Sequence, residues 1–325
     1  MAVPNDGQRV ASNWETVVKT KPEDQIHNDY WLFNQLSEGS GFVARSGGDT
    51  VTGPIEYALN STFQSYSDTD TFSTTRVDVF DRFEDNWKET IITVVMSDLE
   101  RDRNSGEGQK FALLPAKLEN ARNSIKSGKN TMFFGDGTGN SGKDSNGLQN
   151  LVSITPTTGT VEGINRANFS FWRNQQTSGA QTASAFDNLR ASMRSIYNLC
   201  SNGVADQHPT FGVTTRTVFE GYESLLVANE RFTDGAKTGV ADAGFRNERL
   251  KFKGMMLAYD VACLAGALYM LNPAFLKLYY KTGAWMKARP GVEPANQTVE
   301  IIAIRSMFQL MAVQPRRLGV VSAIT

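Results

Sequence analysis

The chain has 325 residues, with 33 lysines and arginines against 34 aspartates and glutamates, so its formal net charge is −1. Hydrophobic residues make up 40% and charged residues 21%, which is globular composition and excludes a disordered or fibrous chain. The near-zero charge excludes a protein that coats nucleic acid through general positive charge. The longest apolar run, Val261–Leu271, has 11 residues, whereas a membrane-spanning helix needs roughly 20.

Cysteine and histidine are too scarce to indicate a disulfide framework or a histidine-based zinc site. The two cysteines, Cys200 and Cys263, lie far apart and lack the CxxC spacing of a redox pair, so we expect small buried apolar side chains in a reducing compartment. The two histidines are His27 and His208. We therefore expect no cofactor, no metal and no catalytic residue.

The first 45 residues are polar and predict an extended arm with one short helix over Pro22–Leu36. Proline suits the first turn of a helix, and Ile26, Tyr30 and Phe33 recur at helical spacing. A single amphipathic helix within a polar segment is expected to pack against another part of the protein.

Residues 46–98 predict a long hairpin. Ile55, Tyr57 and Leu59 alternate with polar residues, residues 60–75 form a loop rich in serine and threonine, and the β-branched segment Trp87–Met96 is expected as the return strand. The segment holds ten acids and three bases, a net charge of −7.

The longest helix is predicted over residues 107–128. Apolar residues recur there at steps of three and four, which gives one apolar stripe: Phe111, Leu114, Leu118, Ala121 and Ile125. Gly128 suits the end of such a helix. Pro115 lies inside the pattern and is expected to kink the helix or to delay its start.

Two more helices and a strand-rich end follow. A helix over 183–200 is expected to present one apolar face, made of Phe186, Leu189, Met193, Ile196 and Leu199. Another is expected over Thr214–Ala228, after a short strand at Phe211–Val213. Thr298–Val313 is rich in β-branched residues and predicts a strand, which Pro315 ends before Leu318–Ile324 resumes. Residues 249–325 hold ten bases and three acids, a net charge of +7.

A glycine-rich segment, Gly137–Lys143, matches the start of a phosphate-binding loop. Its backbone amides would hold phosphate, and Lys143 would reach the outer oxygens. The next residue is Asp144, whose carboxylate would repel phosphate, and no long helix opens there. We favour a surface turn and keep a nucleotide-binding protein as an alternative.

The stretch Lys277–Arg289 interleaves bases with aromatic residues. Such a pattern can form a stacking platform for single-stranded nucleic acid. A strand with one buried face and lysines on its wet face is the more common outcome. We keep nucleic-acid binding here as the weaker alternative.

The order of these elements, with several local phrases, resembles the major capsid protein of tailed double-stranded-DNA bacteriophages. The phrases cover nearly the whole chain: EYALNSTF at 56–63, WK at 87–88, LLPAKLENA at 113–121, DGTG at 136–139, GINRA at 163–167, SFWRN at 170–174 and PRRLGV at 315–320. Pro115 departs from the family pattern, where a helix former is expected.

The resemblance implies an α+β fold with four parts. Residues 1–45 would be the N-terminal arm and 46–95 an extended loop that reaches over a neighbouring subunit. Residues 96–154 and 296–325 would form the peripheral domain with its long spine helix. Residues 155–295 would form the axial domain at the centre of each pentamer or hexamer.

It also implies a non-enzymatic shell subunit. Copies of the chain would form an icosahedral head around DNA without sequence-specific binding, in a virion assembled in the host cytoplasm. A separate scaffolding protein and a portal are expected partners, and a decoration protein is a further one. The same fold also builds encapsulins, cellular compartment shells, which remain the alternative.

Some family members join subunits by isopeptide bonds from a lysine on the extended loop. No lysine occurs here between Lys21 and Lys88, so we predict no such bond. Noncovalent contacts must then hold the shell, with the acidic loop lying on a neighbour's basic surface. The candidate subunit-contact residues are Phe63, Tyr66, Phe72, Asp68, Asp70, Arg316 and Arg317.

Overall fold

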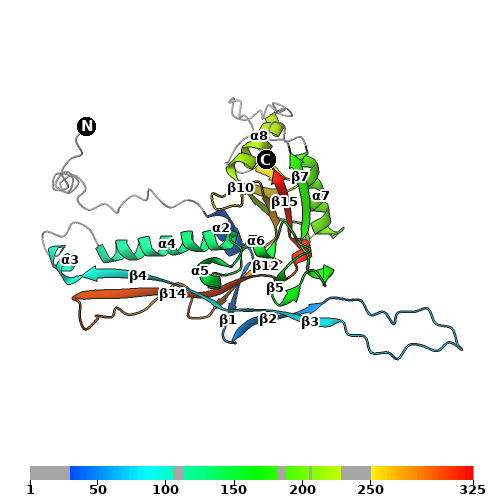
Figure 1. Cartoon of the computed structure of the whole chain (residues 1–325), viewed down its shortest axis with the longest axis horizontal. Helices are drawn as coiled ribbons and strands as arrows, with labels where there is room; N and C mark the ends of the chain where they lie inside the picture. The colour runs from blue at the N-terminus through cyan, green and yellow to red at the C-terminus, as the bar shows by residue number, and fades with distance from the viewer. Residues whose placement is uncertain (1–29, 105–112, 182–187, 205–206, 228–249, 325) are drawn as a thin grey trace, which may run out of the picture.

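A computed structural model describes residues 30–104, 113–181, 188–204, 207–227 and 250–324. The molecule has three visible parts in Figure 1: an arm made of α4, β4 and β14, a rounded body that carries α7 and α8, and a thin projection formed by β2, β3 and the chain between them. The helices are α2 (Trp31–Glu38), α3 (Asp98–Arg103), α4 (Leu113–Phe134), α5 (Gly139–Gly142), α6 (Leu148–Leu151), α7 (Leu189–Ser201) and α8 (Arg216–Val227), with 3-10 turns η2 (Ser170–Trp172) and η4 (Pro315–Arg317).

Two larger sheets organise the chain. The strands are β1 (Phe42–Arg45), β2 (Thr50–Glu56), β3 (Phe80–Asn86), β4 (Lys88–Ser97), β5 (Thr160–Val161), β6 (Ile164–Asn165), β7 (Gln175–Gln181), β8 (Phe211–Thr214), β9 (Leu250–Phe252), β10 (Met255–Tyr259), β11 (Leu268–Leu271), β12 (Leu276–Lys281), β13 (Lys287–Ala288), β14 (Val299–Ala312) and β15 (Gly319–Ile324). One sheet has the order β1-β12-β14-β13, with β4 also paired to β14, and the other has the order β7-β15-β11-β8-β10-β9. These mixed elements confirm the expected α+β class.

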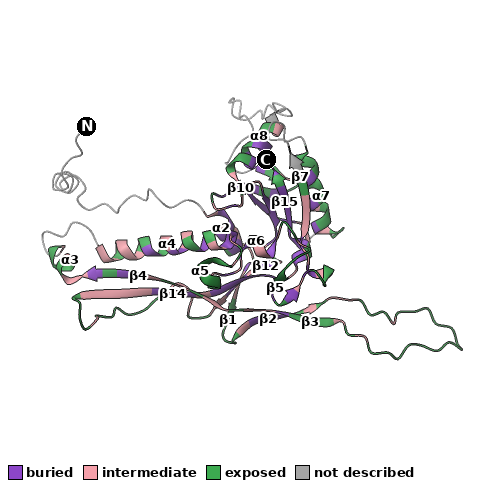
Figure 2. Ribbon diagram, viewed as in Figure 1, coloured by how far each residue is buried: buried purple, intermediate pink, exposed green. Residues whose placement is uncertain are grey.

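The strand β14 connects the arm to the body. Its first part pairs antiparallel with β4 and its last part with β12. Because β-branched and other apolar residues fill this segment, the sequence predicted it within one residue at each end. The main core lies between α2, the end of α4 and the strands β11, β12 and β14, and buried residues follow these elements in Figure 2.

The long helix differs from the prediction at its C-terminal end. Its expected start at residue 107 falls outside the described residues. Pro115 is the third described residue of α4, and proline is compatible with the first turn of a helix, where a backbone N–H needs no partner within the helix. The predicted end at Gly128 is wrong, because α4 continues to Phe134 and buries Phe133 and Phe134 in the main core. That burial offsets the cost of about 1 kcal/mol for a glycine inside a helix.

The hairpin is shorter than expected, and its return strand is a different segment. Strand β2 ends at Glu56, so Tyr57 and Leu59 lie beyond it, and it pairs with β3. The segment Trp87–Met96, expected as the return strand, corresponds to β4 (Lys88–Ser97) and pairs with β14 instead. The alternation of side chains identifies a strand but not its partner, which lies here about 210 positions along the chain.

The body helices pack on the six-stranded sheet. The predicted helix over 183–200 corresponds to α7, whose buried face contains Leu189, Met193, Ile196 and Cys200. The predicted start at residue 183 and the predicted face residue Phe186 lie outside the described residues. Leu199 was expected on this face but is exposed, since Cys200 continues the spacing of four. Both cysteines are buried free thiols, as expected. Helix α2 extends to Glu38, two residues past the predicted end, and the predicted start at Pro22 lies outside the described residues.

Candidate assembly surfaces

The extended loop is held at its base and exposed along its length. Phe83 on β3 is buried and stacks on Trp172 with ring centroids 5.6 Å apart. It also lies against Gly53 on β2, where an added Cβ atom would be 2.3 Å from the Phe83 ring. Glycine therefore lets the two strands close over this ring. Residues 57–79, here called the loop tip, connect β2 to β3 away from the body (Figure 1).

The loop tip presents aromatic rings to solvent. Phe63 is 93% exposed, Tyr66 60% and Phe72 68%. The rings of Tyr66 and Phe72 meet edge to face, with centroids 6.3 Å apart. These three rings belong to no core cluster of the described residues. Exposing such large apolar side chains to water is unfavourable, and aromatic residues are common at protein interfaces.

The acidic residues of the loop tip lie beside these rings. The Asp70 carboxylate accepts a hydrogen bond from the Ser67 amide at 3.0 Å, and the Asp70 amide donates to the Ser67 carbonyl at 2.9 Å, which closes a small turn. Tyr66, Asp68, Asp70 and Phe72 are thus brought together at this turn. Asp68 and Asp70 form no ion pair with any described residue. Their charges are free to meet a partner.

The two arginines at the end of the chain have different surroundings. Arg317 is buried, and its guanidinium donates to the carbonyls of Cys200 and Ser201, at 3.0 and 2.6 Å, at the C-terminal end of α7. This side chain therefore stabilises the subunit's own fold and is not displayed to a neighbour. Arg316 is exposed. Neither lies at the loop tip, which projects away from the body (Figure 1).

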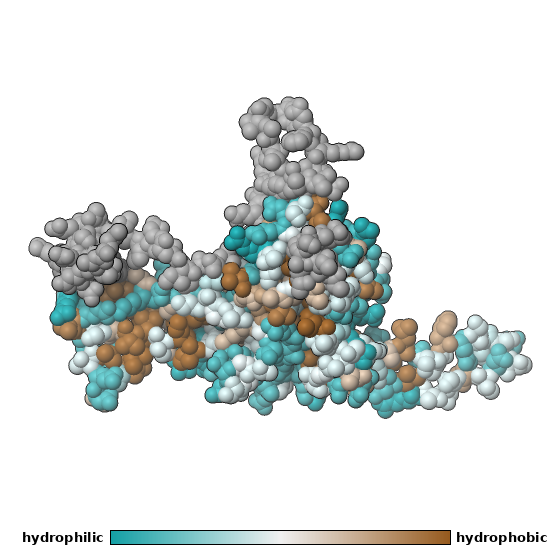
Figure 3. Space-filling model, turned by 45° about the horizontal axis from the view of Figure 1, so that its top comes forward, coloured by the Kyte–Doolittle hydropathy of each residue, from teal (hydrophilic) through white to brown (hydrophobic). Residues whose placement is uncertain are grey.

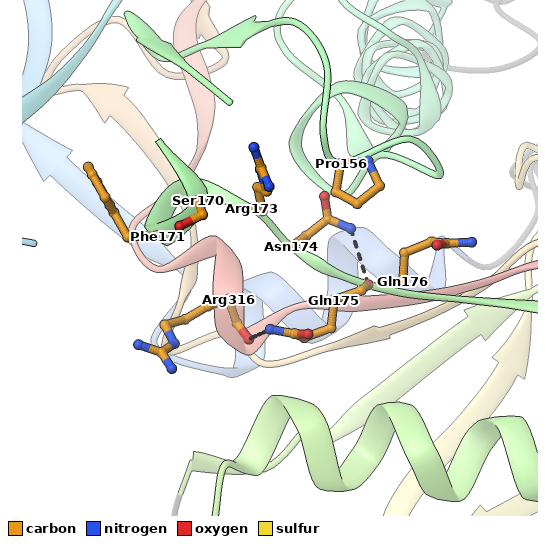
Figure 4. A pocket seen from close by; sticks show the side chains of 8 residues that line it. All are labelled: Pro156, Ser170, Phe171, Arg173, Asn174, Gln175, Gln176 and Arg316. Carbon is orange, nitrogen blue, oxygen red and sulfur yellow. Dashed lines mark hydrogen bonds between the residues drawn. The ribbon is translucent and has the colours of Figure 1, made fainter. Parts of the chain in front are cut away.

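Arg316 lines a polar hollow of about 520 Å³ (Figure 4). The other lining residues are Pro156, Ser170, Phe171, Arg173, Asn174, Gln175 and Gln176. Arg173 already donates to the carbonyls of Arg166 and Ala167, at 2.7 and 2.8 Å, so its guanidinium does not point to the same place as that of Arg316. The residues that line the hollow include no acid–base pair, and the described part of the chain holds no cluster of metal-ligating side chains.

The glycine-rich alternative does not form a phosphate site. Gly139–Gly142 is a single turn in which Asn140 and Ser141 have positive φ angles. The Asp144 carboxylate accepts a hydrogen bond from the side-chain amide of Asn140 at 2.7 Å and lies against Gly139. A negative charge thus occupies the position where phosphate would bind, which confirms the surface turn.

The basic aromatic stretch is also structural. Tyr279 is buried on β12, and Trp285 packs among Phe33, Tyr280 and Phe308. The rings of this stretch pack against the core and do not form an exposed stacking platform, and the prediction of a strand with one buried face is confirmed.

Known structures share this arrangement across nearly the whole chain. No family model matches, and no curated protein matches the sequence. A subunit of the cyanophage A-1(L) capsid superposes with a TM-score of 0.63 at 13% identity, over 94% of this chain and 97% of that one. The capsid of an empty GTA particle gives a TM-score of 0.61 at 10% identity over 94% of each chain. The chain has the major capsid fold of tailed phages.

This capsid fold is shared with a compartment protein. The holo-SrpI encapsulin complex from Synechococcus elongatus PCC 7942 gives a TM-score of 0.59 at 11% identity, over 100% of this chain and 96% of that one. The fold alone therefore does not separate a phage head from an encapsulin. No described helix of this chain is long and apolar enough to cross a bilayer.

A second exposed surface lies on the arm. On β4, Val94 and Ile92 face α4 and pack with Ala121 and Ile125. Because strand residues alternate, Ile91 and Val95 point to the opposite face, where they are 64% and 46% exposed. Figure 3 shows apolar side chains along this arm and also on the extended loop. The sequence predicted a strand here but did not indicate which of its faces is exposed.

Proposed function

We propose that the chain is a non-enzymatic shell subunit that assembles into pentamers and hexamers of an icosahedral phage head around double-stranded DNA. The observation that carries this proposal is the exposed loop tip on a capsid fold. Its rings and acids have no use within the subunit, whereas a neighbour would bury them. At about 25 cal/mol per Å² of apolar area, burial of three rings would contribute several kcal/mol to each contact.

The parts of the chain would serve as the resemblance implies. Residues 1–45 would be the N-terminal arm, which is distinct from the arm of α4, β4 and β14. Residues 46–95 would be the extended loop, 96–154 with 296–325 the peripheral domain, and 155–295 the axial domain. The virion would be its location after assembly in the host cytoplasm, with a scaffolding protein, a portal and in some shells a decoration protein as partners.

The contact would join two unlike surfaces. The rings of the loop tip would lie on the outer face of β4 in the next subunit, where Ile91 and Val95 are exposed, and its acids would meet the basic C-terminal region, whose strand β14 pairs with β4. These surfaces lie toward opposite ends of the molecule (Figure 1). An interface between unlike surfaces repeats from subunit to subunit and closes into a ring when the rotation allows. Pentamers and hexamers are such rings.

Electron microscopy of the expressed protein, alone and with its neighbouring genes, tests this proposal. We expect rings or closed shells from the native chain. The triple variant Phe63→Ala, Tyr66→Ala, Phe72→Ala should remain folded and fail to assemble. A matched variant with three polar changes in the same loop, Ser61→Ala, Ser65→Ala, Thr69→Ala, should assemble. A native chain that stays monomeric under all conditions would refute the proposal.

The encapsulin alternative predicts the same rings of subunits and closed shells, but the shells would enclose different contents. Shells isolated from the natural source would contain double-stranded DNA if the protein forms a phage head. Shells that enclose a protein and no DNA would favour the compartment instead.

A further inference from the structure

Glu162 occupies a backbone position that is unusual for glutamate. It is the first residue of a two-residue turn between β5 and β6, with φ of 54°, and Gly163 follows with φ of 80°. Such turns favour Asn, Asp and Gly, because both residues need positive φ. The Glu162 side chain is only 3% exposed, so it is directed into the protein rather than to solvent.

This one residue joins the extended loop to the body. Its carbonyl accepts a hydrogen bond from the Glu84 amide on β3 at 3.0 Å. Its carboxyl Oε1 accepts one from the amide of Ala312, the last residue of β14, at 2.6 Å. The other oxygen, Oε2, is buried without a hydrogen-bond partner among the described residues. A carboxyl group in this state is costly to ionise.

Charged and titratable groups approach Glu162 from several elements. They are Glu84 and Asp85 on β3, Arg166 after β6, Tyr279 on β12 and Arg45 on β1, whose guanidinium lies over the Tyr279 ring. Arg166 is fully buried but directs its guanidinium to the carbonyls of Asn150, Leu151 and Trp172 rather than to the carboxyl.

The carboxyl group of Glu162 therefore favours its protonated form. Burial raises the pKa of Glu162 to about 8, and the charge of Asp85 acts in the same direction. The Ala312 amide and the charge of Arg166 oppose this shift. One hydrogen bond to an ionised oxygen does not replace the hydration that the buried carboxylate has lost.

We propose that Glu162 is a proton-controlled latch between the extended loop and the body. With its proton, the carboxyl is neutral and the junction of Glu84, Glu162 and Ala312 stays closed. When the proton passes to water, a carboxylate remains with Oε2 unpaired and Asp85 nearby, and the junction opens. The base of the extended loop can then change its angle. A use of this latch in shell assembly rests on the proposed function, whereas the latch itself belongs to the single chain.

The direction of the pH dependence follows from the raised pKa. Glu162 stabilises the closed junction fully below the pKa of a free glutamate, about 4.5, and that contribution is lost as pH rises through about 8. Hydrogen exchange of the Glu84 and Ala312 backbone amides in the unassembled subunit measures this contribution. The measured exchange rates are first corrected for the intrinsic pH dependence of amide exchange. Protection should fall at least about tenfold between about pH 5.5 and about pH 8.5.

Three variants make the test decisive. Glu162→Gln keeps the acceptor for Ala312 without a titrating group, so protection of both amides should not change with pH. Glu56→Gln, which changes an exposed carboxyl at the end of β2 outside the junction, should keep the native pH dependence. Asp85→Asn should move the transition to lower pH, and it provides a readout even if Glu162→Gln fails to fold. Equal pH slopes in the native protein and Glu162→Gln, or an unshifted transition in Asp85→Asn, would overturn the proposal. Because the subunits are unassembled, these results do not depend on whether shells form.

Discussion

The amino group of Lys129 lies 3.6 Å from the centroid of the Trp285 ring, inside the protein. Lys129 is 1% exposed and donates to the Ser306 hydroxyl at 2.9 Å, and its nitrogen also lies 4.9 Å from the Phe308 ring centroid. It forms no ion pair with any described carboxylate. The amino group of Lys129 thus connects α4 to the five-stranded sheet through Ser306 and the surrounding rings.

Replacing Lys129 by methionine should stabilise the unassembled subunit. Burial lowers the pKa of Lys129 from 10.5 to about 7, so the folded state favours the neutral amine while the unfolded chain keeps its proton. The penalty is complete below about pH 7 and declines as pH rises toward 10.5. Lys129→Met removes it and keeps the volume, which should raise the free energy of unfolding by about 1–4 kcal/mol at pH 7.

Thermal unfolding across pH measures this effect. The gain in Tm for Lys129→Met should shrink between about pH 7 and about pH 10. Lys126→Met, one turn earlier on α4, is the matched control and should change stability by less than about 0.5 kcal/mol. A loss of stability in Lys129→Met would mean that the contacts with Trp285 and Ser306 outweigh the cost of burial.

Gly128→Ala should stabilise the protein because α4 passes through this residue. An added Cβ atom would meet nothing within 4 Å, and the backbone is not left-handed. Alanine is preferred over glycine inside a helix by about 1 kcal/mol, so the free energy of unfolding should rise by that amount. Denaturant unfolding measures the change. If Gly128 ended the helix in a left-handed conformation, the same substitution would destabilise the subunit.

Gly147→Ala is the opposing control for Gly128→Ala. A Cβ atom there would be 2.3 Å from the Gly135 carbonyl oxygen and 2.5 Å from that of Met132, both backbone atoms. The backbone would have to move, so this variant should lose stability by at least about 1–3 kcal/mol. Gly128→Ala and Gly147→Ala are thus expected to change the free energy of unfolding in opposite directions.

The sequence predicts elements here better than it predicts pairings or inward-facing charges. Strand β14 was found because β-branched residues fill it, and the exposed rings of Phe63 and Phe72 were found because they lie in a polar segment. The partner of β4 could not be found, since alternation carries no information about a strand far along the chain. Neither could the burial of Lys129 or Glu162, because both residue types are normally exposed and only tertiary packing encloses them.

Adjacent Arg316 and Arg317 should respond differently to the same change. Arg317→Met removes two hydrogen bonds to carbonyls at the C-terminal end of α7, where positive charge is favourable, and should cost about 2–4 kcal/mol of unfolding free energy. Arg316→Met should cost less than about 0.5 kcal/mol, because its side chain is exposed. If Arg316 contacts a neighbour, its variant should assemble poorly while unfolding normally. Equal losses of stability in both variants would contradict the separate roles.

Salt should slow assembly if the acids of the loop tip guide subunits together. At about 1 M salt the screening length falls to about 3 Å, so steering between exposed charges is lost. Light scattering should then show assembly about tenfold slower than at about 0.1 M salt. The double variant Asp68→Asn, Asp70→Asn should be slow at both concentrations. Assembly that is indifferent to salt would leave the apolar contacts alone to set the rate.

Mature particles boiled in detergent should give a single band near the 35.8 kDa of one chain. An isopeptide bond needs a lysine amine, and the loop tip has none. Lys88, the first lysine after it, lies at the start of β4 and donates to the Gly142 carbonyl of its own subunit. A lysine-reactive crosslinker applied to the same particles is the positive control and should produce a ladder of multiples. A ladder without crosslinker would show that subunits are joined through another segment, and mass spectrometry of the joined peptides would locate it.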